Sequence, residues 1–427
     1  MSDELAFEKR YFGHRARLVL TPAQSALIDD QAHAARAMWN LLHEWWTMLP
    51  KHQRSLTAAD VAIRRARKEI DWLAALPAQG AQAVLRTYYR AWKNCWEGRA
   101  DEPRFKARYR TPMSVDLPQG EHLKVARVHR RWGMVNITKV GRVRFHWSKD
   151  LPVGKLTNTH DRISGARLVK DALGWHIAFR VQSLIPKPEP HPGPQVGIDM
   201  GVKVPLALSD GTAFRHDSWL NGPEREELLR LERQAEHRKR CRHPGEKTSR
   251  RLQATYDQIR ALHARAKRRR LNWQHQITTA IARTYGTVVV ERLHITAMLG
   301  SAKGTVEEPG RCVPQKSGLN RAISEQAWGR TIEMLAYKTA HNGGSLIKVP
   351  AADTSRRCSM CGLITPGSRE SQAVFVCKNA DCGWSGNADH NAACNILHLY
   401  RAGHALAPVA GRRSRQARKR VEPTTAR

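Results

Sequence analysis

Residues 358–393 read CSMCGLITPGSRESQAVFVCKNADCGWSGNADHNAA and contain four cysteines spaced C-x2-C-x15-C-x4-C, which are Cys358, Cys361, Cys377 and Cys382. Two short cysteine pairs of this kind can present four thiolates to one tetrahedral Zn²⁺ ion, as in a structural zinc ribbon. Directly after the last cysteine, Asp389 falls in the first turn of a predicted helix over 387–400. The stretch therefore predicts a zinc ribbon over 351–385 that leads into a helix with an acidic start.

Two more carboxylates lie far upstream, each at the end of an apolar run. Asp199 follows VGI at 196–198, and Glu291 follows three valines at 288–290. A charge at the end of a buried strand is costly, so such acids are often functional, although a salt bridge would also satisfy them. Asp389 taken alone is also explained as an acid that the helix dipole favours.

Carboxylates without histidine or cysteine are the ligands that Mg²⁺ prefers, and they also suit Mn²⁺. Two such ions, about 3.5–4 Å apart, can activate a water molecule and stabilise the leaving oxygen of a phosphodiester. The three acids Asp199, Glu291 and Asp389, taken together, therefore predict a two-metal phosphodiesterase.

The composition points to a polyanionic partner. The 427 residues include 72 Lys and Arg against 38 Asp and Glu, which gives a formal net charge of +34. Nucleic acid is the first candidate for such a charge, and a membrane surface is the alternative. The sequence has no apolar run of about 18 residues to span a bilayer and no signal-peptide pattern at its start. We therefore predict a cytoplasmic protein that binds nucleic acid and has no membrane partner.

The other four cysteines are scattered along the chain. Cys95, Cys241, Cys312 and Cys394 show no paired spacing. In a reducing cytosol disulfides are rare, so these four are predicted to be small buried hydrophobic residues.

The N-terminal part is predicted to combine strands with helices. Thr21-Pro22-Ala23-Gln24 reads as a helix start with a capping box, and further helices are predicted over 58–75 and 78–96. From about residue 104 apolar residues alternate with polar ones, as in the runs 142–147 and 175–181, which predicts antiparallel strands. A turn at 171–174 would join two of them.

Prolines at every second position mark 186–195 as a linker. Beyond it we predict charged helices over 223–284 interrupted near 243–245, a polar loop over 300–318, a helix over 321–341 and a strand over 346–349. The polar loop is predicted to be a lid or disordered. The last stretch, 401–427, is predicted to be a disordered basic tail.

Basic and aromatic side chains are the candidates for contacts with nucleic acid. Aromatic rings can stack on bases, but the same spacing is typical of a helix core, and any single arginine is more often a solvated surface charge. The candidates are Arg64, Arg65, Tyr88, Tyr89, Trp92, Arg142, Arg144 and Arg292.

Five segments carry a resemblance to a known family: GIDMGVK at 197–203, VERL at 290–293, GLNRAI at 318–323, TSRRC at 354–358 and NADHNAACNIL at 387–397. In this order they resemble TnpB, the transposon-encoded RNA-guided nuclease also called OrfB, and the miniature type V CRISPR effectors related to it. The resemblance is dense over 196–397, and looser in LTPAQ at 20–24 and PRFK at 103–106.

The resemblance implies a multidomain fold of α/β and β parts. Its elements are an RNase H-like RuvC nuclease domain (196–350 and 386–400) interrupted by the zinc ribbon (351–385), and a wedge β-barrel (1–20 and 104–185) with an inserted helical recognition domain (21–103).

The resemblance also implies that a guide RNA opens target double-stranded DNA beside a short flanking motif, and that one site cuts both strands. In the family three acids hold the metal ions, and Asp199, Glu291 and Asp389 match them. Arg292 departs from the Asp or Asn that relatives often have after the glutamate. An RNA-guided repressor that does not cut and a transposition-associated strand transferase or accessory protein are the alternatives. The oligomeric state is open between a monomer and a homodimer, and the guide could come from a transposon end or a CRISPR array.

Overall fold

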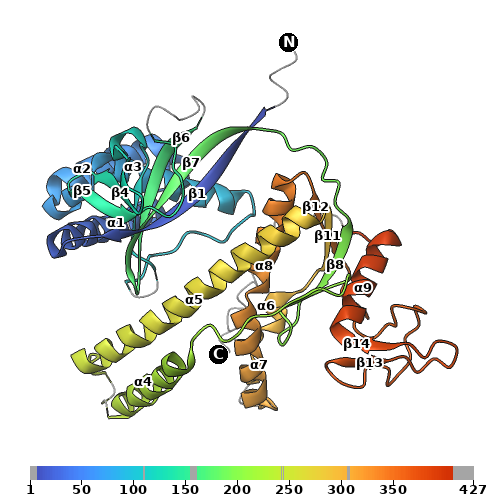
Figure 1. Cartoon of the computed structure of the whole chain (residues 1–427). Coiled ribbons are helices and arrows are strands. Elements are labelled where there is room, and N and C mark those ends of the chain that lie inside the picture. Colours follow the sequence, from blue (N-terminus) through green and yellow to red (C-terminus); the bar gives the residue numbers. More distant parts are fainter. Residues whose placement is uncertain are drawn as a thin grey trace, which may run out of the picture. The chain divides into compact units, whose positions relative to one another are not determined.

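The structure is a computed structural model that describes residues 7–108, 111–153, 161–241, 243, 245–304 and 308–406. The described residues divide into two compact units, 7–186 and 187–406 (Figure 1). Most of the predicted basic tail, from residue 407 onward, lies outside the described residues.

The first unit contains a sheet of seven antiparallel strands in the order β2-β6-β7-β1-β5-β4-β3. The strands are β1 (Phe7–Val19), β2 (Ser114–Leu117), β3 (Ala126–His129), β4 (Trp132–Ile137), β5 (Gly141–His146), β6 (Arg162–Asp171) and β7 (Gly174–Pro186). The first strand joins the two halves of the sheet, because it pairs with β7 along most of its length and with β5 at Leu18 and Val19. The predicted turn at 171–174 is confirmed, with Asp171 paired to Gly174. Closure of this sheet into a barrel stays a prediction.

Three helices follow β1: α1 (Pro22–Met48), α2 (Leu56–Glu69) and α3 (Ala78–Trp96). The predicted capping box is confirmed, since the Gln24 amide donates to Thr21 Oγ1 (3.2 Å) and the Thr21 amide donates to Gln24 Oε1 (3.1 Å). The prediction of one helix over 58–75 is wrong in its second half. There the chain forms a 3₁₀ turn (Asp71–Ala75), so that Leu73 is buried and the Leu76 carbonyl accepts a hydrogen bond from Arg67.

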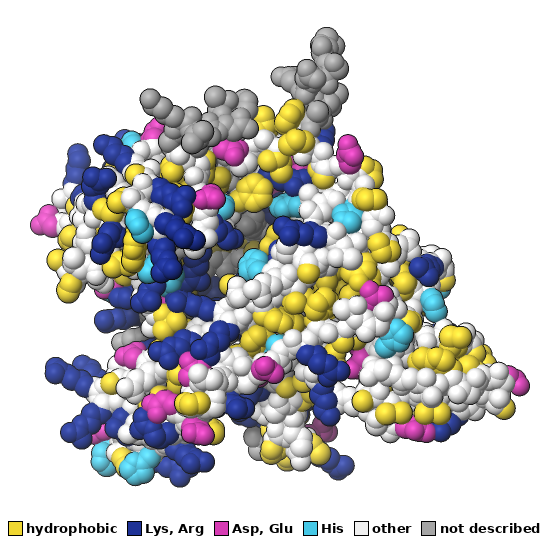
Figure 2. All heavy atoms as spheres, viewed as in Figure 1, with side chains coloured by type: hydrophobic (Ala, Val, Ile, Leu, Met, Phe, Trp, Pro, Cys, Tyr) yellow, Lys and Arg dark blue, Asp and Glu magenta, His cyan; other side chains and the backbone are white. Residues whose placement is uncertain are grey.

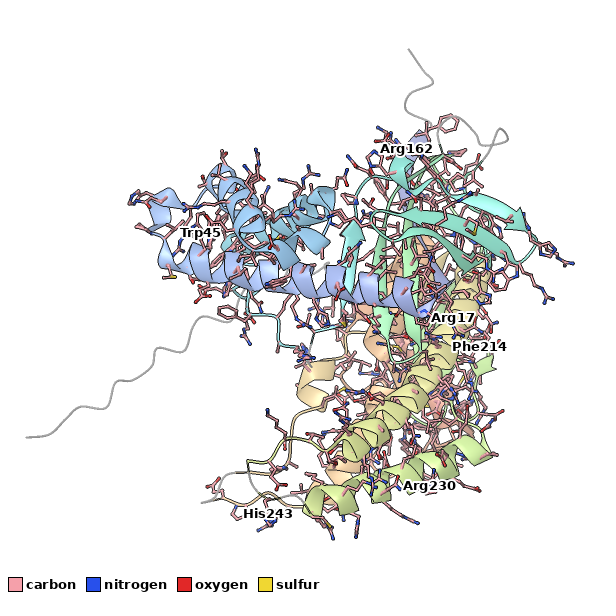
Figure 3. All side chains as sticks on the ribbon, turned by 90° about the vertical axis from the view of Figure 1, so that its left-hand side faces the viewer. Arg17, Trp45, Arg162, Phe214, Arg230 and His243 are labelled. Carbon is pink, nitrogen blue, oxygen red and sulfur yellow. The ribbon has the colours of Figure 1, made fainter. Side chains whose placement is uncertain are left out.

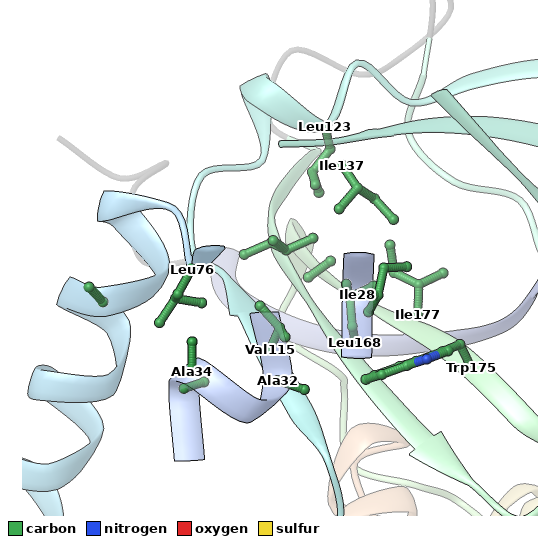
Figure 4. Packing of buried hydrophobic residues seen from close by; sticks show 14 of the residues in the cluster. Ile28, Ala32, Ala34, Leu76, Val115, Leu123, Ile137, Leu168, Trp175 and Ile177 are labelled. Carbon is green, nitrogen blue, oxygen red and sulfur yellow. The ribbon is translucent and has the colours of Figure 1, made fainter. Parts of the chain in front are cut away.

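The helices and the sheet of the first unit share one hydrophobic core. Figure 4 shows Ile28 and Ala32 of α1 among Val115, Leu168 and Ile177 of the sheet. The helical insertion is therefore packed on the strands and has no separate core of its own.

The second unit is built on a five-stranded sheet in the order β10-β9-β8-β11-β12. Its strands are β8 (Gln195–Asp199), β9 (Leu206–Leu208), β10 (Ala213–Phe214), β11 (Thr287–Glu291) and β12 (Ser345–Val349). The strands β8, β11 and β12 are parallel, and β9 runs antiparallel to β8. The apolar runs before Asp199 and Glu291 are thus buried central strands, as predicted.

Helices cover both faces of this sheet (Figure 1). The helices of the second unit are α4 (Gly222–Arg240), which packs on α5, α5 (Arg250–Thr284), α6 (Ile295–Met298), α7 (Val313–Gln326), α8 (Trp328–His341) and α9 (Ala388–Arg401). The ribbon adds strands β13 (Val374–Val376) and β14 (Ser385–Asn387). Helices α5 and α8 share a core with Ile198 and Val290, whereas α9 packs on Val289 on the opposite face. None of the described helices combines the length and the apolar character needed to cross a bilayer.

The hairpin of α4 and α5 carries much of the basic charge. Lys and Arg side chains gather over its outer end in Figure 2, and Figure 3 shows such side chains, among them Arg230, extending from α4. The break predicted near 243–245 is confirmed, since α4 ends at Arg240 and α5 begins at Arg250.

The polar loop predicted over 300–318 is shorter in the structure. Helix α7 already begins at Val313, and Ala327 in a left-handed conformation (φ 49°) separates it from α8, so the predicted single helix over 321–341 is also wrong. Polar side chains hold α7 in place, because Lys316 donates to the Met298 carbonyl (2.7 Å) and Asn320 donates to the Leu299 carbonyl (3.1 Å). Residues 305–307 lie outside the described residues.

Two of the scattered cysteines contradict their prediction. Cys241 and Cys312 are exposed, and Cys95 and Cys394 are only half-buried. The first two follow or precede helices at positions where no neighbouring element covers the side chain, which the local sequence does not reveal.

The proline-rich segment is held against the second unit. The His191 amide donates to the Gly343 carbonyl (3.1 Å), and the His191 ring lies 3.1 Å from the Arg283 carbonyl. The segment is therefore a fixed connection along this part of the chain.

Gly197 lets α9 lie directly on β8. A Cβ atom added there would stand 2.2 Å from the Ala393 carbonyl oxygen and 2.9 Å from the Leu397 amide nitrogen. We expect Gly197→Ala to push α9 away and to lower the free energy of unfolding by about 1–3 kcal/mol, measured by denaturant titration. Gly318→Ala is the control, because its Cβ would meet nothing within 4 Å inside α7 and should be neutral or slightly stabilising. Equal stability of the two variants would contradict the close packing.

Candidate metal-binding active site

Asp199 and Glu291 end two neighbouring parallel strands. Ile198 of β8 is paired with Val290 of β11, so the two acids that follow are the next pair at the carboxyl edge of the sheet. Residues paired across parallel strands point to the same face. The two carboxylates therefore project from the same edge and the same face.

That face is the one covered by α9. Gly197, two residues before Asp199, contacts α9 at Ala393, and α9 also packs on Val289, two residues before Glu291. Asp389 stands one helical turn before Ala393, toward the start of α9. The fold thus directs all three acids to one place, where α9 begins above the edge of the sheet.

The electrostatics show that the acids are close enough to interact. Burial, together with the negative charges of Glu291 and Asp389, raises the pKa of Asp199 to about 7. Burial also raises the pKa of Glu291 and of Asp389. The fold therefore brings the three distant acids together in a site where burial disfavours their charged forms.

The three carboxylates form an open group. Among the described residues, the four ribbon cysteines form a group whose potential ligand atoms all lie within 4.8 Å of one another. The carboxylate oxygens of the three acids do not all lie within this distance of one another. Two ions about 3.5–4 Å apart would span a wider ligand set than one ion. The oxygen-only donor set fits Mg²⁺ or Mn²⁺ in chemistry.

Arg369 of the ribbon is a member of this site that the sequence did not reveal. Its Nη2 lies 3.6 Å from Asp389 Oδ1, and its charge lowers the pKa of Asp199 against the effect of burial. The same nitrogen donates to the Gln372 carbonyl (3.1 Å), which orients the guanidinium. No spacing in the sequence links residue 369 to the acids, because the contact depends on how the ribbon folds back on α9.

Thr354 is the second residue that sequence reasoning missed. Its hydroxyl donates a hydrogen bond to Glu291 Oε1, and its carbonyl accepts one from Asn395 Nδ2 of α9 (2.9 Å). Asn391 and Asn395 are both fully buried and also hold the Arg357 carbonyl (2.7 Å each). The sequence signal for this contact was the pair Asn391 and Asn395, which lie one helical turn apart. Buried amide side chains at this spacing must find hydrogen-bond partners on a neighbouring segment.

The four ribbon cysteines are arranged as ligands of one tetrahedral ion. The Sγ atoms of Cys358 and Cys382 are 3.8 Å apart, and those of Cys361 and Cys377 are 3.7 Å apart. Four sulfurs at about 2.3 Å from a central zinc would be separated by about 3.8 Å. The cluster, which packs on Phe375, could therefore hold Zn²⁺ as predicted.

A relative places this chain in a family. The Escherichia coli (strain K12) protein named "Putative RNA-guided DNA endonuclease InsQ" is 34% identical over 344 residues, which cover 79% of this chain and 77% of that protein. This chain belongs to the TnpB (OrfB) family. A second relative of this TnpB-family chain is the Streptomyces pristinaespiralis protein named "Putative RNA-guided DNA endonuclease", which is 27% identical over 400 residues, covering 91% of this chain and 89% of that protein.

Two family models match parts of this chain, and a solved structure shares its fold. Residues 176–302 match the model described as "Probable transposase", and residues 328–396 match "Cas12f1-like, TNB domain". The TnpB-family fold also resembles the "Cryo-EM structure of the Cas12f1-sgRNA-target DNA complex", with a TM-score of 0.52 and 17% identity over 88% of this chain and 83% of that one. At this identity the likeness concerns the fold.

The aromatic candidates for base stacking in this TnpB-family chain need correction. Tyr88 and Trp92 are buried (0% and 6% exposed) against Trp46 in the core of the helical insertion, so the core explanation holds for them. Tyr89 is half-buried, and its neighbour Trp96 is 57% exposed. The spacing of the aromatic residues identified the helix correctly, but it did not say which side faces solvent.

Four of the five basic candidates are exposed to solvent. Arg142 and Arg144 are exposed on β5, and the Arg144 guanidinium lies 5.3 Å from the centre of the Trp132 ring. Arg64 and Arg65 are exposed on α2 and form ion pairs with acids one turn away, Asp60 and Glu69. Arg292, the fifth basic candidate, follows Glu291 and is half-buried. Its backbone amide donates to the Val349 carbonyl (2.9 Å). Their contact with nucleic acid stays a prediction.

Proposed function

We propose that this TnpB-family protein is an RNA-guided DNA endonuclease that hydrolyses target DNA at one RuvC-like site, beside a short flanking motif. The observation that carries the proposal is the convergence of Asp199, Glu291 and Asp389, where α9 begins above one edge of the sheet. The names of the relatives in Escherichia coli and Streptomyces pristinaespiralis support the guide and the substrate. The excess of basic residues supports a large nucleic-acid partner.

In this proposal Asp199, Glu291 and Asp389 hold two Mg²⁺ ions. When bound there, the ions supply an activated water molecule and stabilise the leaving oxygen of the scissile phosphodiester. Thr354 fixes the orientation of Glu291, and Arg369 supplies a positive charge beside Asp389 that can contact a phosphate oxygen. The role of the four cysteines is to hold a structural Zn²⁺ that keeps the ribbon folded around these two residues.

The two structural units can also be assigned to the domains that the family resemblance implies. We assign the second unit to the RuvC-like nuclease domain with its ribbon, and the sheet and helices of the first unit to the wedge and recognition domains. The strand order around β8 and the fold likeness to Cas12f1 support this assignment.

The test is a reconstitution with the RNA that copurifies with the full chain. The RNA is sequenced, and a plasmid carrying the matching target beside a randomised flanking segment is incubated with the complex and Mg²⁺. We expect cleavage of both strands that requires the RNA, the target and the divalent ion.

Other outcomes separate the alternatives. Binding of the matching target without cleavage would favour the RNA-guided repressor. DNA strand transfer without RNA would favour the transposition-associated function that the "Probable transposase" model describes. Absence of any copurifying RNA would contradict the proposal.

The hydrogen bond from Thr354 to Glu291 is expected to affect the rate of cleavage. Thr354→Val keeps the shape of the side chain but removes the donor, so Glu291 loses its orientation and we expect cleavage to slow by about 10-fold. Thr354→Ser keeps the hydroxyl and should retain most of the rate. The half-saturating Mg²⁺ concentration should rise only in the valine variant, and equal values in both variants would contradict a positioning role.

A further inference from the structure

A cavity of about 310 Å³ lies within the first unit, between α1, α3 and the strands β2 and β6. Much of its wall consists of small or apolar side chains, among them Ala35, Val84 and Met113. Sites that enclose a small ligand begin at about this volume. The cavity is well separated in the sequence from the metal-binding residues and has no part in the chemistry proposed above.

The wall also carries three cationic side chains, Arg36, Lys106 and Arg167. In the part of the chain that the structure describes, no carboxylate forms an ion pair with Lys106. The acid in the wall, Asp116, is already held by Arg180 through two hydrogen bonds of 3.0 and 2.8 Å. The cavity therefore carries uncompensated positive charge.

Lys106 is fixed in this position by its neighbours. Its amide donates to Asn40 Oδ1 (2.8 Å), and its carbonyl accepts a hydrogen bond from Asn40 Nδ2 (3.3 Å). The ammonium lies 3.6 Å from the centre of the Trp39 ring, and the ring nitrogen of Trp39 is itself bound to the Arg104 carbonyl (3.0 Å). Rigid groups thus hold an ammonium over an aromatic ring inside the cavity.

The position is unfavourable for an ammonium ion in the free protein. Burial and the nearby charge of Arg167 lower the pKa of Lys106 to about 8. The contact with Trp39 offsets part of this cost, but it supplies no counter-charge. A bound anion would compensate the three cations and raise the pKa of Lys106 again.

We propose that this cavity binds one nucleotide unit of a nucleic-acid strand, with its phosphate group between Lys106, Arg36 and Arg167. The inference rests on the proposed function, which supplies the strand. The volume leaves room beside a phosphate group for a sugar or a base against the apolar wall. The Ser114 hydroxyl in the wall accepts a hydrogen bond from Arg167 (3.0 Å), which orients that guanidinium, and its own proton can be donated to a phosphate oxygen.

The first experiment measures protection of Lys106 in the full chain. Amine-selective methylation at about pH 8, followed by mass spectrometry, compares Lys106 with Lys68, which is exposed on α2. The probes are inorganic phosphate, 5′-AMP, the guide RNA alone, and the guide complex with target DNA. We expect Lys106 to be methylated before Lys68 in the free protein and to be protected about 10-fold or more by a strand. Protection by guide RNA alone assigns the site to the guide, and protection only after target addition assigns it to DNA.

The second experiment uses the variant Lys106→Met, which keeps the aliphatic stem and removes the charge. We expect affinity for the protecting strand to fall by about 10- to 100-fold, as for the loss of a charge-assisted hydrogen bond. The matched variant Lys68→Met should change affinity by less than about threefold. In the absence of nucleic acid, the melting temperature of Lys106→Met should equal or exceed that of the wild type.

Two results would overturn the inference. The first is that neither guide RNA nor target DNA protects Lys106 from methylation, although the wild-type complex still cleaves DNA. This result would leave the proposed function intact. The other is a clear drop in the melting temperature of Lys106→Met with unchanged affinity, which would make the lysine structural. Failure of the wild-type chain to bind any RNA would instead count against the proposed function.

Discussion

Asp199→Asn is expected to abolish DNA cleavage and, at the same time, to stabilise the metal-free protein. Replacing one carboxylate that holds the metal pair should lower the cleavage rate by about 1,000-fold or more. The stability gain follows from the surroundings of Asp199, which is buried beside two other carboxylates and whose pKa is raised to about 7. An amide at this position carries no charge to be repelled.

The raised pKa of Asp199 makes the free energy of unfolding depend on pH. In the unfolded chain Asp199 releases its proton near its usual pKa of 3.8, whereas in the folded chain it keeps the proton up to about pH 7. The folded state therefore binds more protons between these values, and the free energy of unfolding falls as pH rises through this window. We expect the titration of Asp199 to lower the free energy of unfolding of the wild type as the pH rises from about 4 to about 7. Asp199→Asn should not show this decrease.

Melting temperatures in chelator, at about pH 5 and about pH 8, measure this difference. The advantage of Asp199→Asn should be larger at the higher pH, and added Mg²⁺ should stabilise the wild type more than the variant. Asp257→Asn is the control, because Asp257 is exposed on α5 and its partners there are Arg260 and Gln253 of the same helix. A variant Asp199→Asn that cleaves DNA, or that is less stable than the wild type at high pH, would contradict the assignment of this residue.

Loss of zinc from the ribbon is the second change expected to have a large effect. A structural Zn²⁺ contributes roughly 10–16 kcal/mol to the folding of a small domain, so Cys358→Ser should unfold the ribbon. Ala388, the first residue of α9, packs in the same cluster as Cys358 and Phe375. Unfolding therefore frees the start of α9, which displaces Asp389 and withdraws Arg369 and Thr354 from the site.

We expect Cys358→Ser to lower cleavage by about 100-fold or more while guide RNA stays bound, because the first unit has its own core. Zinc content, cleavage rate and hydrogen exchange of the α9 peptide are measured on the same sample. Cys241→Ser is the matched control, because Cys241 is exposed and lies outside the ribbon. Full cleavage by a folded but zinc-free Cys358→Ser protein would show that the ribbon does not support the active site.

Much of the fold was predictable because the decisive signals are local. The capping box at Thr21, the alternation in β5 and β7 and the apolar runs before Asp199 and Glu291 depend only on neighbouring residues. The errors occurred where tertiary contacts override local preference. Helix α7 begins inside the polar segment that was predicted as a loop, since its Lys316 and Asn320 find carbonyl partners on a preceding segment.

The amino-acid sequence by itself determined the ligand types of the two candidate metal sites and the strand ends that carry Asp199 and Glu291. Spacing and hydrophobic period are properties of the chain alone, so they could be read directly. The tertiary structure decided what surrounds these groups: the raised pKa of Asp199, the contacts of Arg369 and Thr354 with the acids, and the cavity around Lys106. Burial and the distance between charges exist only once segments far apart in the sequence have packed together.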